Sequence, residues 1–377
     1  MSTGRQVVLS VVAPCYNEER TLARCIERLR AIADEHVALQ ILIVDDGSRD
    51  DSVGIARQLH AGHPEIIVIE QPANQGKGAA LRAGFARATG DFVAVQDADL
   101  EYNPADLKRL LGPLIAGDAD VVIGSRFIST GVHRVLYFWH SVGNHILTLL
   151  SNMCTDLNLT DMESGYKVFR REVIQRITIE EDRFGFEPEV VAKLAHLRVR
   201  IYEMGISYYG RTYAEGKKIG LKDGVRALYC ILRYNAHKAP VPVQFVLYLG
   251  IGGAAALVNL ALFLVMFQAG WPVQVAAPAA FGLAACVNYA LCVTVLFKHR
   301  ARWKSPGELA AFLLVVAVVG LMDVGMTRML LELGWAPVVA KLVATSFGLV
   351  LNFAGRRFLV FPEPPTGPWE PQEHTPV

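Results

Sequence analysis

The most constraining feature of this 377-residue sequence is a set of four long apolar runs that follow one another in its second half. They cover residues 245–267, 273–297, 309–331 and 338–361. Each run is long enough to cross the hydrocarbon core of a bilayer, which takes about 20 residues of helix. The high apolar content of the chain, 52% against 19% charged residues, is concentrated in these runs. The sequence therefore predicts four transmembrane helices.

Positive charge is distributed unevenly around these runs. The first connection carries no charge, whereas the second carries four cationic side chains, at Lys298, Arg300, Arg302 and Lys304. Because cytoplasmic loops are enriched in lysine and arginine, we expect the second connection and both termini to face the cytoplasm. The N-terminus shows no secretory signal. These features predict a multi-pass protein of the cytoplasmic (inner) membrane with its N-terminal domain in the cytoplasm.

The first half of the chain alternates short apolar runs with helical patterns. Strands are predicted at residues 7–13, 39–44, 66–69, 92–95 and 121–123. Helices are predicted at 19–33, 51–59, 79–88 and 105–116. This alternation predicts an α/β domain with a mostly parallel sheet covered on both faces, and ligands bind such sheets at the carboxyl ends of the strands.

Polar and glycine residues follow each of the first four predicted strands. They occupy residues 14–19, 45–50, 74–80 and 97–101. Four such loops at one rim favour a ligand site over four unrelated turns. The turn at 74–78 lacks the spacing of a P-loop, so we expect a nucleotide to lie across the rim with Lys77 facing its anionic part.

The last of these loops gathers three carboxylates within five residues, Asp97, Asp99 and Glu101. Carboxylates this close repel one another, and Mg²⁺ or Mn²⁺ bound together with phosphate oxygens relieves that repulsion. The cluster therefore predicts a metal-assisted nucleotide site. The alternative is that Asp97 or Asp99 only caps the helix that begins near Pro104. The six cysteines form no C-x-x-C pair, so neither a zinc site nor a disulfide framework is expected.

Residues 11–19, 44–48 and 74–78, together with Asp97-Ala98-Asp99, resemble glycosyltransferase family 2, and within it the dolichyl- and polyprenyl-phosphate sugar synthases. Residues 243–361 resemble the GtrA-type four-helix membrane domain. The resemblance implies a GT-A catalytic domain over residues 1–220 and a membrane domain over 243–361. Between them, the spacing of apolar and basic residues predicts an interfacial helix with a linker over 221–242. The proline-rich composition of residues 362–377 predicts a disordered tail.

The resemblance also implies a function. A hexose would be transferred from a UDP- or GDP-hexose to a polyprenyl phosphate, undecaprenyl or dolichyl, with inversion, at the cytoplasmic membrane face for cell-surface glycan assembly. Two alternatives remain open: extension of a lipid-linked glycan at a hydroxyl acceptor, and a lipid-linked sugar transporter with a nucleotide-sugar-sensing domain. No nucleic-acid partner is expected, and the donor sugar, its base and homo-oligomer formation are left open.

Site residues follow from the resemblance by motif. Nucleotide-sugar binding would involve Pro14, Tyr16, Glu18, Asp45, Asp46, Lys77, Asp97 and Lys217. The metal, Mg²⁺ or Mn²⁺, would be held by Asp97, Asp99 and Glu101. Catalytic roles would fall to Asp99, Arg126, Arg211 and Asp161. The acceptor phosphate would meet Arg134, Ser141 and Asn144.

Charge considerations refine these roles. Arg211 and Lys217 lie among glycines, which suits a lid over the leaving diphosphate. A phosphate monoester is already largely ionised near neutral pH, because its second pKa is about 6, so a strong general base is not obligatory. Asp161 and Glu187 remain open as bases, sugar ligands or structural acids. Amphipathic helices predicted over 135–153 and 222–238 would lie on the bilayer surface.

Overall fold

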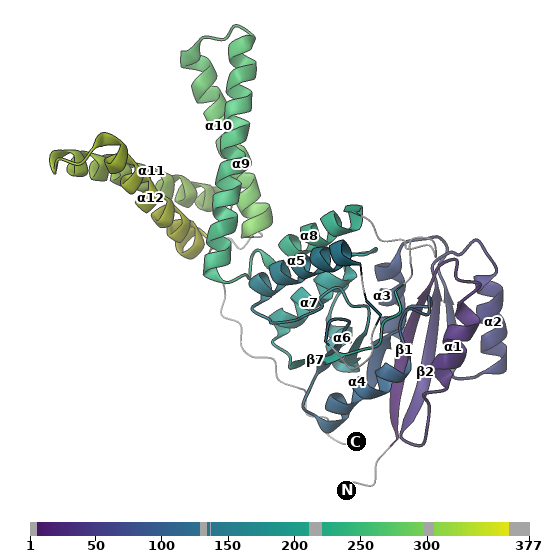
Figure 1. Cartoon of the computed structure of the whole chain (residues 1–377). Coiled ribbons are helices and arrows are strands. Elements are labelled where there is room, and N and C mark those ends of the chain that lie inside the picture. Colours follow the sequence, from purple (N-terminus) through teal and green to yellow (C-terminus); the bar gives the residue numbers. More distant parts are fainter. Residues whose placement is uncertain (1–5, 129–133, 136, 211–220, 298–304, 362–377) are drawn as a thin grey trace. The chain divides into compact units, whose positions relative to one another are not determined.

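The computed structural model describes residues 6–128, 134–135, 137–210, 221–297 and 305–361 (Figure 1). The chain divides into two compact units, the first ending at Asn235 and the second starting at Ala236. The predicted lid residues Arg211 and Lys217 and the predicted tail at 362–377 lie outside the described residues.

A seven-stranded sheet in the order β3-β2-β1-β4-β6-β5-β7 forms the centre of the first unit. All neighbouring strands are parallel except β6, which runs antiparallel to both β4 and β5. This confirms the predicted mostly parallel sheet and adds two strands, β6 and β7. The strands are β1 (Val7–Cys15), β2 (Val37–Asp45), β3 (Ile66–Glu70), β4 (Phe92–Val95), β5 (Val121–Ser125), β6 (Lys167–Arg170) and β7 (Ile201–Gly205).

Helices pack on both faces of this sheet. Eight belong to the first unit: α1 (Leu22–Arg30), α2 (Ser52–Gly62), α3 (Lys77–Arg87), α4 (Ala105–Ala116), α5 (Phe138–Thr155), α6 (Arg171–Arg176), α7 (Phe186–Leu197) and α8 (Leu221–Asn235). Because side chains alternate along a strand, Leu9 and Val11 of β1 enter a core with residues of α1 and α4. Val12 points to the other face and meets Gly84 of α3. The alternation of β1 thus fixes which helix covers which face.

The boundary of the first unit differs from the predicted one. The sequence places a separate interfacial helix and linker over 221–242, but α8 packs against α5 and α7 and clusters through the fully buried Cys230 with Ala192 of α7. Arg226 of α8 also forms an ion pair with Glu181, a residue that is 2% exposed. The first unit therefore includes α8 because this helix buries its own inner face there.

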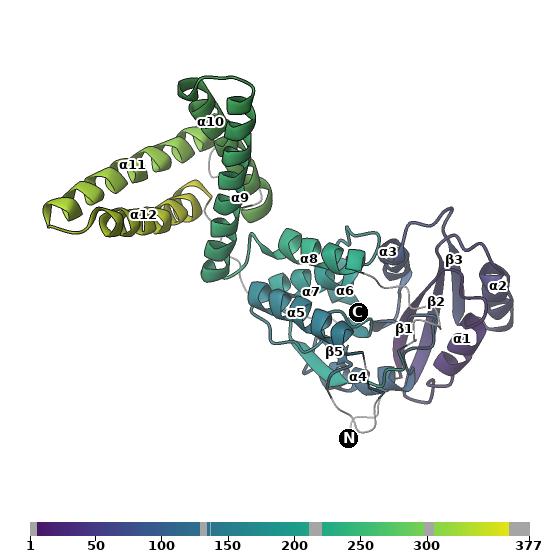
Figure 2. The same ribbon diagram turned by 45° about the horizontal axis from the view of Figure 1, so that its top comes forward.

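The second unit consists of two helical hairpins, visible in Figures 1 and 2. They are formed by α9 (Val241–Gln268) with α10 (Val273–Leu291), and by α11 (Ser305–Glu332) with α12 (Pro337–Ala354). Each hairpin continues into a π-helical turn, η2 (Cys292–Leu296) and η3 (Gly355–Val360). All four helices are long and apolar enough to cross a membrane, which confirms the four predicted spans. Apolar side chains such as Leu321 and Val338 are over 70% exposed, as expected of a surface that faces lipid.

The contact between Gly84 and Val12 generates a prediction about stability. A Cβ atom at Gly84 would lie 2.2 Å from Cγ1 of Val12, a stiff β-branched side chain. Gly84→Ala should therefore destabilise the first unit by about 1–3 kcal/mol, the usual cost of overpacking a core. Thermal melts of the purified protein, followed by circular dichroism, measure the effect.

Gly143 of α5 provides the matched control, because it is exposed and a Cβ atom there meets nothing within 4 Å. Gly143→Ala should be neutral or stabilising by up to about 1 kcal/mol, since alanine is the better helix former. Equal melting temperatures for the two variants would contradict the packing argument.

Candidate functional site

Three of the loops predicted to meet at the rim are joined by hydrogen bonds. In the loop after β1, the Asn17 backbone N–H donates to Ser48 Oγ at 3.0 Å and the Glu18 N–H donates to Ser52 Oγ at 2.9 Å. The Asp46 carboxylate accepts the N–H groups of Gln75 and Gly76 at 2.8 and 2.7 Å. The loops after β1, β2 and β3 therefore form one connected rim.

Asp45 and Asp46 are both buried, but they have different uses. Both carboxylate oxygens of Asp46 hold the glycine-rich turn, so this residue is a structural clamp for Lys77 and the start of α3. Asp45 Oδ2 accepts the N–H groups of Gly47 and Ser48 at 3.0 Å, and Oδ1 has no partner among the described residues. Gly47 has φ +69°, and a Cβ there would lie 2.8 Å from the backbone of Ala73. Asp45 thus keeps one carboxylate oxygen without a hydrogen bond to the described residues. The loop that follows it requires glycine at position 47.

Lys77, at the first turn of α3, lies between two carboxylates. Its Nζ is 2.9 Å from Asp97 Oδ1 and 3.1 Å from Glu187 Oε1. Burial alone would lower the pKa of Lys77, but the charges of Asp97 and Glu187 outweigh it and raise the pKa well above its usual value. The ammonium group is therefore fully charged at neutral pH, and it connects the loop after β4 with α7.

The three expected metal ligands do not converge. Asp97 faces Lys77, Glu101 Oε2 accepts the Tyr208 hydroxyl at 2.7 Å, and Asp99 Oδ1 accepts the Glu101 N–H at 3.2 Å. No group of three His, Cys, Asp or Glu side chains suited to a metal ion occurs in the described part of the chain. The expected three-carboxylate site is therefore not formed, because Lys77 and Tyr208 each engage one of its members.

The donor set at this loop still suits a hard cation that is shared with a ligand. Asp99 and Asp97 supply only carboxylate oxygens, and both are partly exposed at the end of β4. Mg²⁺ is commonly held by one or two protein carboxylates together with the phosphate oxygens of its substrate. These residues therefore fit a divalent ion whose remaining ligands come from a diphosphate.

Arg126, which follows β5, forms a buried bidentate pair with Asp161. Its Nε and Nη2 lie 2.7 Å from Asp161 Oδ2 and Oδ1, and its backbone N–H donates to Oδ2 at 3.0 Å. Burial alone would raise the pKa of Asp161, but Arg126 lowers it below the usual value. Asp161 is thus an ionised carboxylate fully engaged by arginine, which makes it a poor general base. Its hydrogen bonds instead hold the Arg126 side chain in one orientation.

Asn144 of α5 completes this cluster. Its Oδ1 accepts from Arg126 Nη2 and its Nδ2 donates to Asp161 Oδ1, both at 3.2 Å. Ser141 lies one turn earlier on the same helix and is half-buried, and Arg134 is exposed just before it. The structure therefore joins Asn144 to Arg126 directly, while Arg134 contributes no described contact to that cluster. Pro14, near the end of β1, and Tyr16 and Glu18, in the loop after it, are half-buried.

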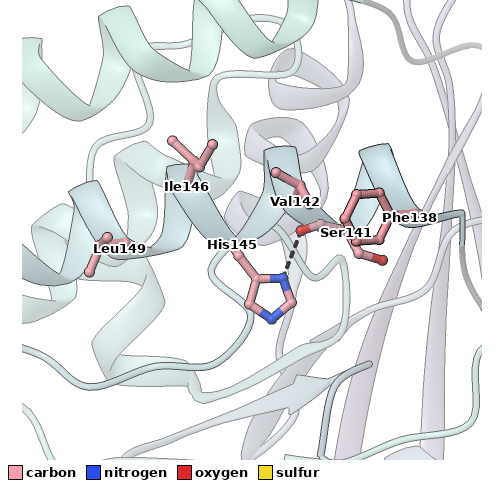
Figure 3. A pocket seen from close by; sticks show the side chains of 6 residues that line it. All are labelled: Phe138, Ser141, Val142, His145, Ile146 and Leu149. Carbon is pink, nitrogen blue, oxygen red and sulfur yellow. Dashed lines mark hydrogen bonds between the residues drawn. The ribbon is translucent and has the colours of Figure 1, made fainter.

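The outer side of α5 forms a shallow apolar hollow of about 370 Å³ (Figure 3). His145 stands within it and its Nδ1 is 2.7 Å from the Ser141 backbone oxygen. The hollow is lined by Phe138, Ser141, Val142, His145, Ile146 and Leu149. One helix therefore presents a polar side to Arg126 and an apolar side to the exterior, as the predicted amphipathic helix over 135–153 requires.

Two ionisable residues near this site, the half-buried Glu163 and the buried Lys167, do not figure in the sequence-based assignments. Glu163 Oε1 is buried without a hydrogen-bond partner among the described residues, and burial raises the pKa of this carboxyl to about 8. Lys167 is fully buried, with Nζ donating to the Met162 and Ser164 carbonyls, and burial lowers its pKa to about 8. Their signal in the sequence is a set of three charged residues, Asp161, Glu163 and Lys167, the last of which begins the short strand β6.

The Glu163 carboxyl should make stability fall with rising pH. Between its ordinary pKa of 4.5 and about 8, the folded chain holds a proton that the unfolded chain releases. The stabilisation is therefore complete below pH about 4.5 and is lost as pH rises through about 8. Glu163→Gln, which mimics the protonated form, should remove this fall in stability. The melting temperature of the variant minus that of the wild type should therefore increase from pH 5 to pH 8.

Melting curves in a pH series measure this difference. Lys167, Glu187, Arg126 and Asp161 are the charged groups that act on Glu163, and all remain in the variant. Glu35, whose side chain is 84% exposed, gives the control substitution Glu35→Gln. Parallel pH curves for Glu163→Gln and the wild type would show that this carboxyl does not hold the proton.

Comparisons with known proteins agree with this architecture. Residues 10–178 match the family model for glycosyl transferase family 2, and residues 247–361 match the GtrA/DPMS transmembrane domain. An undecaprenyl-phosphate mannosyltransferase of Micrococcus luteus is 31% identical over 225 residues, which cover 56% of this chain and 88% of that protein. A dolichol-phosphate mannosyltransferase of Pyrococcus furiosus is 25% identical over 356 residues, covering 93% of this chain and 97% of the relative.

Other matches are partial. The low-salt glycan biosynthesis hexosyltransferase Agl6 of Haloferax volcanii is 34% identical over 221 residues, so the matched region covers 58% of this chain and about half, 51%, of that relative. Glucosyl-3-phosphoglycerate synthase of Mycobacterium tuberculosis matches in structure with a TM-score of 0.48 and 22% identity, covering 61% of this chain and 80% of that chain. The family models and the Micrococcus relative are decisive: the chain belongs to glycosyltransferase family 2 and joins a GT-A catalytic domain to a GtrA/DPMS transmembrane domain.

Proposed function

We propose that the protein transfers a hexose from a nucleotide-diphosphate hexose to the phosphate of a polyprenyl phosphate, with inversion at the anomeric carbon. The reaction would take place at the cytoplasmic face of the cytoplasmic membrane, with both chain termini on that side. One observation carries the proposal. The first unit combines the charged rim with the buried Arg126, and Arg126 lies beside the apolar hollow on α5. The two relatives named for lipid-phosphate mannosyl transfer, one of them similar along nearly the whole chain, support it.

The rim supplies groups for the donor. The free Oδ1 of Asp45 is an acceptor for a ring N–H, which uracil and guanine both present, and Pro14, Tyr16 and Glu18 border the same loop. Lys77 is a fixed cation at the start of α3, where helix N–H groups also favour an anion. Together they suit a nucleoside diphosphate, with the UDP or GDP choice decided by contacts to the base.

Asp99, with Asp97, would hold the divalent ion against the diphosphate. That ion would supply charge neutralisation to the leaving nucleotide. Lys77 adds a second positive charge from the protein, and it is already oriented by Asp97 and Glu187 before any ligand arrives. Arg211 and Lys217 are proposed to cover the diphosphate from the segment that lies outside the described residues.

The acceptor is proposed to approach along α5. Its phosphate would meet Arg126 and the neighbouring Asn144, with Ser141 and Arg134 nearer the exterior, and its first isoprene units would lie in the apolar hollow. A phosphate dianion needs no base to attack, which agrees with the engagement of Asp161 by Arg126. Arg126 screens the repulsion between the two anionic substrates and directs one phosphate oxygen in line with the departing group.

A donor and acceptor panel tests the function. The purified full chain with Mg²⁺ or Mn²⁺ is incubated with labelled UDP-glucose or GDP-mannose and with undecaprenyl phosphate or undecaprenol. Transfer to the phosphate alone is expected. Transfer only to a hydroxyl acceptor, or no transfer from any of a wider set of nucleotide hexoses, would overturn the proposal.

Asp99→Ala should abolish this transfer and leave the protein folded. Loss of charge stabilisation for the leaving diphosphate should lower kcat by at least about a hundredfold. Asp118→Ala is the control, because Asp118 is an exposed acid that follows α4, far along the chain from the rim loops. Near-normal turnover of Asp99→Ala at saturating metal would contradict the assignment of Asp99 to the ion.

The hollow on α5 gives a test of the acceptor. Leu149, 58% exposed, lines it, and Leu149→Glu would place a charge against the isoprenoid chain. The KM for undecaprenyl phosphate should rise about tenfold, equivalent to about 1.4 kcal/mol, while the KM for the donor stays unchanged. Ile115→Glu, on α4 and 52% exposed, is the matched control. An equal effect of both substitutions would refute a role for the hollow.

A further inference from the structure

The two hairpins of the second unit end in a repeated motif. The stretch from Asn288 to Phe297 reads N-Y-A-L-C-V-T-V-L-F, and the stretch from Asn352 to Phe361 reads N-F-A-G-R-R-F-L-V-F. Both enter a π-helical turn, and such turns are frequent at functional sites. The closing rings of the two copies, Phe297 and Phe361, stack with their centroids 4.8 Å apart. The repeat therefore brings two equivalent turns together.

The copies differ in charge at two neighbouring positions, where the first has Cys292 and Val293 and the second has Arg356 and Arg357. Both arginines are buried, and Arg356 is the one that contacts both copies. Arg356 is only 5% exposed. Its Nη1 donates to Asn288 Oδ1 at 2.8 Å, and its Nε donates to Asn352 Oδ1 at 3.2 Å. Cys292 Sγ lies 3.4 Å from the same Nη1. The asparagines of both copies thus orient one guanidinium group.

Aromatic rings from the other two helices enclose this group. The guanidinium carbon lies 4.3 Å from the ring centroid of Phe312 on α11 and 5.4 Å from that of Tyr248 on α9. Two hydrogen-bonded nitrogens and two rings fix its plane. Within the described residues, Nη2 has no hydrogen-bond partner, so two donor N–H bonds remain available in a fixed direction.

The charge of Arg356 lacks a counter-charge in the described part of the chain, where no carboxylate lies within the 4.0 Å of an ion pair. A buried cation without a partner in an apolar environment costs several kcal/mol, and membrane proteins retain such groups mainly for function. Neutral asparagine oxygens and ring faces orient the cation but do not neutralise it. An anion bound at Nη2 would neutralise the charge of Arg356.

The depth of Arg356 indicates which anion. It lies four residues before the end of the candidate span Pro337–Val360, and its partner Phe312 lies two residues after the start of the span Ala310–Glu332. Tyr248 is in the second turn of α9, the helix that follows α8 after only five residues. The guanidinium is therefore near the head-group level of the leaflet at which the chain leaves the catalytic unit.

We propose that Arg356 is the centre of a binding site for the phosphate of a polyprenyl phosphate, formed where η2 and η3 meet. This inference rests on the proposed function for the identity of the lipid. A guanidinium whose Nη2 keeps two N–H donors suits a phosphate monoester, and the isoprenoid chain would remain in the bilayer along the apolar helices. The membrane domain thereby holds a lipid phosphate separate from the one at Arg126.

Native mass spectrometry of the full chain, in nanodiscs of phosphatidylcholine, counts bound lipid. The wild type should bind two equivalents of undecaprenyl phosphate, and Arg356→Gln should bind one. Arg356→Lys, which keeps the charge but loses the planar guanidinium held by both asparagines, should bind the second equivalent about tenfold more weakly. The control Arg328→Gln, at an exposed position of α11, should keep both equivalents. Undecaprenol should not bind at either site.

Three outcomes would overturn the inference. If Arg356→Gln still binds two equivalents of undecaprenyl phosphate, Arg356 serves only in packing. This conclusion would hold whatever the melting temperature of the variant. Displacement of the second equivalent by millimolar inorganic phosphate would assign the site to free phosphate. A photoactivatable polyprenyl phosphate that labels no peptide of η2 or η3 in the wild type would exclude the location, and this readout does not depend on any variant folding. Hexosyl transfer by the wild type, measured in the same nanodiscs, reports on the proposed function separately, because its absence would leave the lipid count unchanged.

Discussion

The contact of Lys77 with Asp97 and Glu187 is the interaction on which the rest of the catalytic unit depends. It connects the start of α3, the loop after β4 and the start of α7, three elements that are far apart in the sequence. Placing one ammonium and two carboxylates in a largely buried position is favourable only when their geometry is tightly held. The backbone provides that geometry, because Asp46 clamps the turn before Lys77 and the Asp182 carbonyl accepts the Ala79 N–H. The charged rim is thus organised before a ligand binds.

The same contact explains why sequence reasoning succeeds for the elements and fails for part of the site. Strands β1 to β4 are marked by apolar runs bounded by polar loops, and the spans by their length, so both could be predicted. β6 and β7 could not, because Lys167–Arg170 is short with charged ends and Ile201–Gly205 is only partly buried. The carboxylates Asp97, Asp99 and Glu101 are close in sequence, but the partners that separate them, Lys77 and Tyr208, come from distant segments. Proximity along the chain therefore grouped these three carboxylates and missed the partners, Lys77 and Tyr208, that separate them.

Helix α5 carries the second organising feature, which is the division between its two sides. Asn144 and Thr148 face inward, where Thr148 Oγ1 accepts the Met162 N–H at 3.2 Å, and they bind the loop that holds Asp161. The opposite side exposes Ile146 and Leu149, each more than half exposed. Such a contiguous apolar surface is unfavourable in water and needs an apolar partner. A substrate with a charged head and an insoluble tail matches both sides of one helix, which a soluble sugar acceptor would not.

Two buried arginines, one in each unit, differ in whether a carboxylate balances their charge. The charge of Arg126 is balanced by Asp161 through two parallel bonds, and in the proposed function its remaining N–H donors would orient the acceptor phosphate. Arg356 is equally buried but is surrounded by amide oxygens, a thiol and ring faces, which define its direction without balancing its charge. An acid in place of Asn288 or Asn352 would have formed a closed ion pair from the same backbone. Both repeated positions carry neutral acceptors, so packing satisfies the structure of the turns, but no carboxylate among the described residues balances the charge of Arg356. This imbalance is the reason for proposing an anion from outside the protein at this site.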